Sequence, residues 1–293
     1  MARSRSRSRR SSRRGSGGNA WKIPSIIVLS LVGVGFVAFF LMGTLSQQTE
    51  TDRITGCLID QSEIPVSITI IYDTSEPLVE SQELEIQNRI NAIVRDENQF
   101  PVFSKLAVYR VESDINRGIT PVSFSFDGSG ASNSGIEYFC RPRTDWTQSR
   151  LWRRFNEQLP DMYTVAVLNS VGNSGEQYSP LIDALRYVAS SLFASSATTK
   201  NRVIIVSDLI ENSEFFSMYQ NDWYETFTDD REFMLSQSPN FPSGTSVEVL
   251  LLRRPQYSIQ SIDPSSNFQR FWESIIAVNR NVGLTMTTVS GGL

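Results

Sequence analysis

Oxygen-bearing side chains stand at the ends of three segments that the pattern predicts to be structured. Asp73 and Ser75 follow one apolar run, and Asp208 follows a later one. Ser179 precedes a predicted helix. Carboxylate and hydroxyl oxygens are the ligands that Mg²⁺ prefers, and residues two apart can point toward the same spot. If the three loops meet, these four side chains predict a magnesium site with a position open to a partner's carboxylate. The alternative is that Asp73, Ser75 and Asp208 only cap helices and satisfy loop amides.

The chain lacks the residues of the common catalytic arrangements. It contains no histidine, which excludes Ser-His-Asp and Cys-His catalysis and His-ligated zinc. Neither a GxSxG sequence, a P-loop nor a GxGxxG sequence stands in a usable context. These absences favour a non-catalytic protein. The alternative is a magnesium-dependent hydrolase that uses Asp73 and Asp208, although no general base is identifiable.

Strands and helices alternate along most of the chain after residue 62. Strands are expected at residues 66–73, 106–111, 122–126, 163–171, 202–207 and 246–252. Helices are expected at residues 76–96, 148–159, 180–196 and 267–278. This order predicts an α/β fold, a Rossmann-like and mainly parallel sheet with helices on both faces. In such sheets ligands bind at the carboxyl ends of the strands, where the oxygen-bearing loops are expected.

In this order, the three loops resemble those of the von Willebrand factor A-type domain. That family places D-x-S-x-S after its first strand, a T-x-L-x-x-A-L-like segment before a helix, and an Asp after its fourth strand. The corresponding segments here are DTSEP from Asp73, SPLIDAL from Ser179, and Asp208. The resemblance implies a metal-ion-dependent adhesion site and a protein partner. It departs from the family at Pro77, which replaces the second serine, and at Ser179, which replaces the usual threonine.

Two insertions interrupt this pattern, at about 127–148 and 211–244. The second is rich in aromatic side chains, and its form cannot be read from the sequence. These side chains suggest either a small core of their own or a recognition surface. The residues expected at such a surface are Phe215, Phe216, Tyr219, Trp223 and Tyr224.

The chain has two cysteines, Cys57 and Cys140, both in the part that follows residue 50. In an oxidising compartment two thiols favour one disulfide, which would close a loop of about 80 residues. The alternative is two unrelated buried thiols.

The sequence of the N-terminal part predicts a membrane anchor. Residues 23–45 carry no charge, and as a helix they would be about 35 Å long, enough to span a bilayer. A cleaved signal peptide would have a shorter apolar stretch and an A-x-A-like site. Residues 1–22 hold eight Lys or Arg and no acid, so the positive-inside rule places the N-terminus in the cytoplasm. This Arg/Ser-rich tail is expected to be a disordered topology signal, the alternative being RNA binding.

The remainder of the chain is acidic. Subtracting the eight basic residues of the tail from the 27 in the chain leaves 19 against 31 acids, a net charge of −12. A nucleic-acid groove on this part is therefore disfavoured. The predicted organisation is a tail (1–22), a transmembrane helix (23–45), a linker (46–62) and one α/β domain (63–293).

These features predict a single-pass protein of a bacterial inner membrane with a periplasmic domain. It would bind another protein at the carboxyl edge of its sheet, as an accessory subunit of a bacterial or phage-encoded envelope complex. Mg²⁺ is a candidate cofactor, but no cofactor is the preferred expectation. An oligomeric structural subunit with an inactive ligand site is the remaining alternative.

Overall fold

The computed structural model describes most of the chain after residue 49. The residues described are 50–52, 54–75, 78–111, 119–122, 137–143, 152–153, 155–156, 178–193, 200–254, 260, 263–277 and 281–289. No helix in these ranges is both long and apolar enough to cross a membrane. The predicted tail (1–22) and transmembrane helix (23–45) lie outside the described residues.

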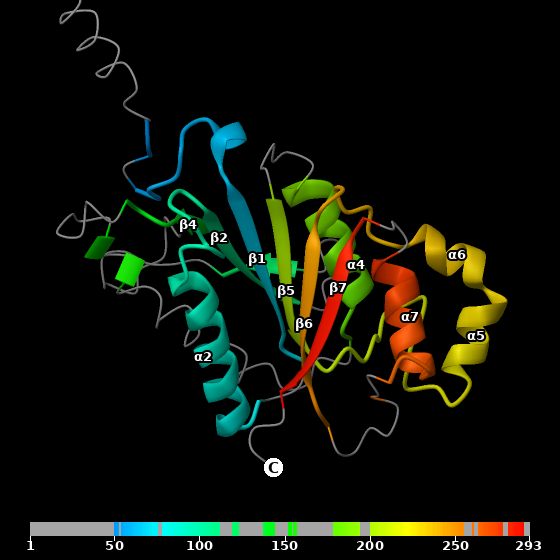
Figure 1. Cartoon of the computed structure of the whole chain (residues 1–293). Coiled ribbons are helices and arrows are strands. Elements are labelled where there is room, and N and C mark those ends of the chain that lie inside the picture. Colours follow the sequence, from blue (N-terminus) through cyan, green and yellow to red (C-terminus); the bar gives the residue numbers. More distant parts are fainter. Residues whose placement is uncertain are drawn as a thin grey trace, which may run out of the picture. The chain divides into compact units, whose positions relative to one another are not determined.

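A seven-stranded, mostly parallel sheet with helices on both faces forms an α/β fold (Figure 1). The strands are β1 (Val66–Asp73), β2 (Lys105–Val111), β3 (Ile119–Pro121), β4 (Tyr138–Cys140), β5 (Lys200–Ser207), β6 (Ser246–Leu252) and β7 (Gly283–Val289). The sheet order is β3-β2-β1-β5-β6-β7. All neighbours from β2 to β7 are parallel, whereas β3 and β4 pair antiparallel with different parts of β2.

Among the described residues, helices lie between β1 and β2 and between successive strands from β4 to β7, whereas none lies between β2, β3 and β4. The helices are the 3₁₀ helix η1 (Gln61–Glu63), α2 (Glu80–Arg95), α4 (Leu181–Tyr187) with the π-helix η3 (Val188–Leu192), α5 (Trp223–Asp229), α6 (Arg231–Ser236) and α7 (Asn267–Ile276). Helix α2 covers one face of the sheet, and α4 and α7 cover the other; α5 and α6 pack outside α7 (Figure 1).

Two hydrophobic cores fill the space between the sheet and these layers. Successive residues of a strand point to opposite faces, so Ile70 packs in the core under α2 and Ile71 in the core under α4 and α7. Strand β1 has neighbours on both sides and helices on both faces. Seven of its eight residues are therefore buried, which explains its nearly continuous apolar sequence.

Most predicted elements are present with adjusted ends. The predicted helix at 76–96 begins at Glu80, where the Gln82 side chain accepts a hydrogen bond from the Val79 N–H. The helix predicted at 180–196 is α4 continued by η3. Residues 152–153 and 155–156 are helical, as expected for 148–159. The strand predicted at 163–171 lies outside the described residues.

Three differences from the sequence-based prediction concern strands. β3, at Ile119–Pro121, was not predicted, and residues 123–126 of the strand predicted at 122–126 lie outside the described residues. β4 and β7 were not predicted at all. The sequence indicated 246–252 as the last strand, but β7 follows it and pairs in parallel along all of β6.

The segment before β1 belongs to the same compact unit. That unit spans Glu50–Leu293 and so includes residues 50–62 of the predicted linker (46–62). Cys57 is buried and forms a disulfide with Cys140 of β4, as the two cysteines predicted. The bond joins residues 83 positions apart and holds the N-terminal segment against the edge of the sheet at β2 and β4.

Candidate functional site

Asp73, the last residue of β1, is the centre of the site at the carboxyl edge of the sheet. Its Oδ2 accepts hydrogen bonds from the hydroxyls of Ser179 (2.9 Å) and Ser207 (2.7 Å). Its Oδ1 accepts one from the backbone N–H of Ser75 (3.0 Å). Asp73, Ser179 and Ser207 are all buried. The parallel pairing of β1 with β5 places the ends of both strands at this edge.

Three of the four predicted site residues, Asp73, Ser75 and Ser179, therefore come together. Asp208 lies beside them in sequence but uses its carboxylate elsewhere. Its Oδ1 accepts the backbone N–H of Ile210 at 2.9 Å, and its Oδ2 lies 3.9 Å from Nε of Arg254. Asp208 and Arg254 are both buried, so the nearby guanidinium offsets part of the cost of burying the carboxylate, although Nε of Arg254 and Oδ2 of Asp208 are too far apart for a hydrogen bond.

The neighbouring polar side chain of Gln260 ties two strand ends together. Its amide donates to the carbonyls of Asp208 (2.8 Å) and Leu252 (2.9 Å), and its oxygen accepts the N–H of Arg254 (2.7 Å). Backbone groups at the ends of β5 and β6 are thereby hydrogen-bonded by a side chain. The buried Gln260 side chain thus uses its oxygen and its amide group to connect the ends of β5 and β6.

The donor set fits a closed hydrogen-bond network better than a divalent cation. Both predicted carboxylates accept a hydrogen bond from the backbone N–H two residues further along. Asp side chains commonly bond the backbone of their own loop in this way. Asp73 is also bonded to two hydroxyls, and Arg254 already supplies positive charge beside Asp208. Within the described part of the chain, no three His, Cys, Asp or Glu side chains form a cluster that could hold a metal. The preferred expectation that no cofactor binds stays a prediction, and Glu76 and Pro77 lie outside the described residues.

Glu211 is a third carboxyl group near this edge. It is fully buried, and its Oε2 accepts the backbone N–H of Ile182 at 3.0 Å. Burial raises its pKa to about 8, the hydrogen bonds to it opposing the shift only in part. Glu211 therefore holds its proton at neutral pH and carries no charge toward the site.

Leu209 adopts a backbone conformation that is rare for its type. Its φ is 57°, in the left-handed region, which costs about 1–2 kcal/mol for a residue with a Cβ. Its N–H donates to the Ser207 hydroxyl (2.8 Å), and its carbonyl accepts from the Trp272 indole N–H (3.1 Å). The Leu209 side chain is fully buried, so these contacts and its apolar burial hold the strained turn.

Two exposed tyrosines stand in the segments beside Ser179. Bridges connect Ser179 to Asn212 and Asn212 to Ser217, which brings the segments around 179, 212 and 217 side by side. Tyr178 is 44% exposed and Tyr219 is 51% exposed. This tyrosine rim, Tyr178 and Tyr219, presents aromatic surface next to a closed polar network.

The aromatic insertion at 211–244 is mainly a core rather than a surface. Phe216 and Trp223 are buried and pack on Phe271 of α7, with ring centroids 5.1 and 5.8 Å away. These two were predicted at a partner surface, and the structure corrects that prediction, since α5 and α6 need their rings to pack against α7. Of the five predicted residues, Tyr219 is exposed, and Phe215 and Tyr224 are half-buried.

Sequence reasoning missed Ser207, Glu211, Arg254 and Gln260. Ser207 had a usable signal, because it is a hydroxyl at the very end of an apolar strand. The other three follow no recognisable spacing and reach the edge through the tertiary fold.

Comparisons with known proteins give no family for this chain. No protein-family model matches it, and no curated protein matches it. Among solved structures, the pilus adhesin SpaC from Lactobacillus rhamnosus GG aligns over 82% of this chain, at 9% identity and a TM-score of 0.37. The human COPII-coat protein Sec24c aligns over 78%, at 10% identity and a TM-score of 0.35. The chain spans 29% and 30% of these two proteins.

Proposed function

We propose that this chain is a membrane-anchored, non-catalytic interaction module with a von Willebrand factor A-like domain. It would serve as an accessory subunit of a bacterial or phage-encoded envelope complex. The observation that carries the proposal is the contrast at the carboxyl edge of the sheet. The carboxylates there are bonded within the protein, whereas the adjoining tyrosines are exposed.

The bonded carboxylates argue against catalysis. A general base must reach a substrate's proton and be free to accept it. Asp73 accepts three hydrogen bonds and Asp208 pairs with Arg254. Glu211 is buried and keeps its own proton. A hydrolase that used Asp73 and Asp208 would first have to dismantle these contacts.

The tyrosine rim supports binding to another protein. Tyrosine is enriched at the centres of protein interfaces, because it buries a large ring and keeps a hydroxyl for hydrogen bonding. Tyr178 and Tyr219 project from segments that the bridges at Asn212 hold together. A partner that covers the rim would meet a preformed surface.

The proposed location follows from the charge pattern and the disulfide. The uncharged stretch 23–45, preceded by eight basic residues, supports a single span with its N-terminus in the cytoplasm. The disulfide between Cys57 and Cys140 is typical of an oxidising compartment, such as the periplasm. Both features suit a domain that meets its partner outside the cytoplasm.

Site-specific photo-cross-linking in native membranes tests this function. A photoreactive phenylalanine analogue replaces Tyr178 or Tyr219 in the full chain, with Leu84 on α2, which is 57% exposed, as the matched position. We expect one discrete product with a different protein from the tyrosine positions and not from Leu84. Products that contain only this chain would instead support a structural oligomer. The same products from all three positions would refute docking at the rim.

A further inference from the structure

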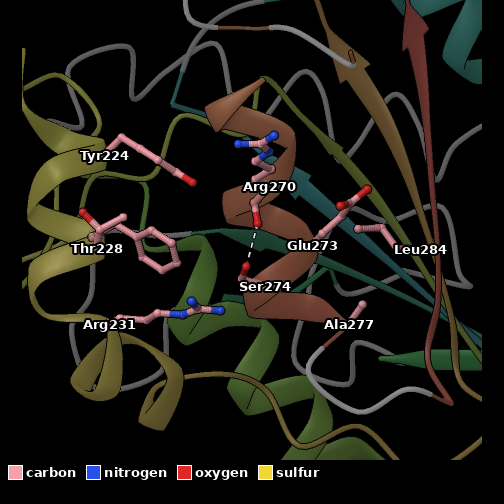
Figure 2. Close-up of a pocket in the computed structure, with 9 residues that line it drawn as sticks. Tyr224, Thr228, Arg231, Arg270, Glu273, Ser274, Ala277 and Leu284 are labelled. Carbon is pink, nitrogen blue, oxygen red and sulfur yellow. Dashed lines mark hydrogen bonds between the residues drawn. The ribbon is translucent and has the colours of Figure 1, made fainter. Parts of the chain in front are cut away.

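A groove of about 610 Å³ lies between α5 and α7 (Figure 2). Its lining includes Tyr224 and Thr228 of α5, Arg231 of α6, Arg270 and Glu273 of α7, and Leu284 of β7. Tyr224 and Arg231 extend from one wall toward α7, and Glu273 extends toward Leu284 (Figure 2). These residues differ from those of the tyrosine rim.

Two positive charges from opposite walls line this groove, and neither has a partner among the residues that the structure describes. Arg231 and Arg270 are exposed, and neither side chain forms an ion pair or hydrogen bond within the described ranges. Other arginines of the domain are paired, such as Arg186 with Asp183 and Arg202 with Glu248. In a part of the chain whose net charge is −12, two unpaired guanidiniums on one groove form a local site for negative charge.

We propose that this groove binds an acidic, extended segment of a partner protein. Each guanidinium has five N–H donors and can hold a carboxylate in a bidentate pair. The aromatic ring of Tyr224 and the side chain of Leu284 offer apolar contacts to the residues between the acids. A second surface of this kind goes beyond docking at the tyrosine rim.

The groove suits a peptide better than a nucleic acid. Glu273 lies on the same wall as Arg270 and would repel a continuous row of phosphates, whereas a peptide can place an amide N–H there. The acidic domain as a whole also repels a polyanion at long range. A peptide with separated carboxylates avoids both costs.

The strand that borders the groove favours an extended ligand. β7 is the last strand of the sheet, and no strand in the described part of the chain pairs with its outer edge. Its sequence, GLTMTTV, has neither charge nor proline, the features that usually protect an edge. An extended segment that leaves the groove beside Leu284 therefore meets a strand edge that no strand in the described part of the chain occupies.

The test measures fluorescence anisotropy with the full chain in mild detergent. The probe is a fluorescein-labelled peptide that alternates Glu and Leu, and a matched peptide carries Lys in place of Glu. The variants are Arg231→Glu and Arg270→Glu. Arg95→Glu, an exposed arginine of α2 that keeps the same charge change away from the groove, is the control. Near-ultraviolet circular dichroism verifies that each variant is folded.

We expect the acidic peptide to bind saturably, and each groove variant to weaken binding about tenfold, as for a lost charge-assisted hydrogen bond. Arg95→Glu should bind as the parent does. Equal losses in all three variants, or equal binding of the Lys peptide, would overturn the proposal. So would tighter binding of a labelled single-stranded RNA through the same arginines, which would assign the groove to nucleic acid. Cross-linking at the tyrosine rim is unaffected by any of these outcomes.

Discussion

The Ser207 hydroxyl donates a hydrogen bond to the Asp73 carboxylate across 2.7 Å and so joins the ends of β5 and β1. The same hydroxyl accepts the N–H of Leu209, the residue with positive φ. One buried side chain therefore links two central strands and supports the turn that follows. This link occupies the position where the sequence predicted a cation between loops.

Replacing Ser207 with alanine is expected to destabilise the domain. The change leaves the Leu209 N–H buried without its acceptor and removes one of the two hydroxyls on Asp73. An unsatisfied buried group costs about 1–3 kcal/mol, so the free energy of unfolding should fall by that amount. Urea denaturation of the full chain in mild detergent measures it. Ser246→Ala, at the exposed start of β6, should change the free energy little. Equal effects of the two substitutions would contradict the proposed role.

Magnesium is expected to leave the melting temperature unchanged. A ligand that binds only the folded state raises the melting temperature, so a working cation site would respond to millimolar Mg²⁺. Arg254 beside Asp208 and the hydroxyls on Asp73 oppose such binding. Thermal melting with and without Mg²⁺ provides the measurement, with Asp73→Ala as the comparison. A rise in the parent that Asp73→Ala abolishes would establish the metal site and would count against the closed network.

The central strands could be predicted because buried strands contain runs of apolar residues that are visible in the sequence. β1, β5 and β6 each lie between two neighbours and two helical layers, so each contains a buried apolar run, such as VIIV in β5 and VLLL in β6. β7 lies at the edge, and only its last residue is buried. Its sequence alternates apolar and polar residues after a glycine, which is the pattern of a half-buried edge strand, so β7 carried a usable signal that the prediction overlooked. β4 has three residues, too few for any period to show.

The sequence predicted only one aspect of the site, namely that loops which follow parallel strands meet at one edge of the sheet. That argument correctly brought Asp73 and Ser179 together, since parallel strands end at one edge. It did not predict that Arg254 would pair with Asp208, or that Glu211 would lie under the start of α4. Both depend on where distant segments fold back, and no local spacing reports such contacts.

Stability is expected to fall with rising pH because of Glu211. Its folded pKa of about 8 exceeds the ordinary value of 4.5, so the folded state holds a proton that the unfolded state releases. The stabilisation is fully present below the unfolded pKa and is lost as the pH rises through the folded one. Between these values the free energy of unfolding should fall by roughly 1.4 kcal/mol per pH unit.

Urea denaturation at several pH values in this window tests the Glu211 prediction. Glu211→Gln keeps an oxygen for the Ile182 N–H but cannot ionise, so its profile should be flatter. Glu214→Gln, an exposed neighbour, should retain the parent slope. Hydrogen bonds to the carboxyls of Asp52, Asp60, Asp96 and Asp263 lower their pKa values. These groups therefore change the free energy of unfolding only in more acidic solution. A parent slope unchanged by Glu211→Gln would show that another group causes it.

Reduction of the disulfide is expected to cause the largest loss of stability. The bond between Cys57 and Cys140 closes a loop of 83 residues, which the chain-entropy model values at about 4–5 kcal/mol. It also holds the segment from Glu50 against β4, where Cys140 donates its N–H to Thr55. Urea denaturation with and without reductant measures the effect on the parent. The double variant Cys57→Ser with Cys140→Ser should unfold at the same urea concentration as the reduced parent, with or without reductant. If the oxidised and reduced parents unfold at the same urea concentration, the bond has no role in stability and its argument for an oxidising compartment weakens.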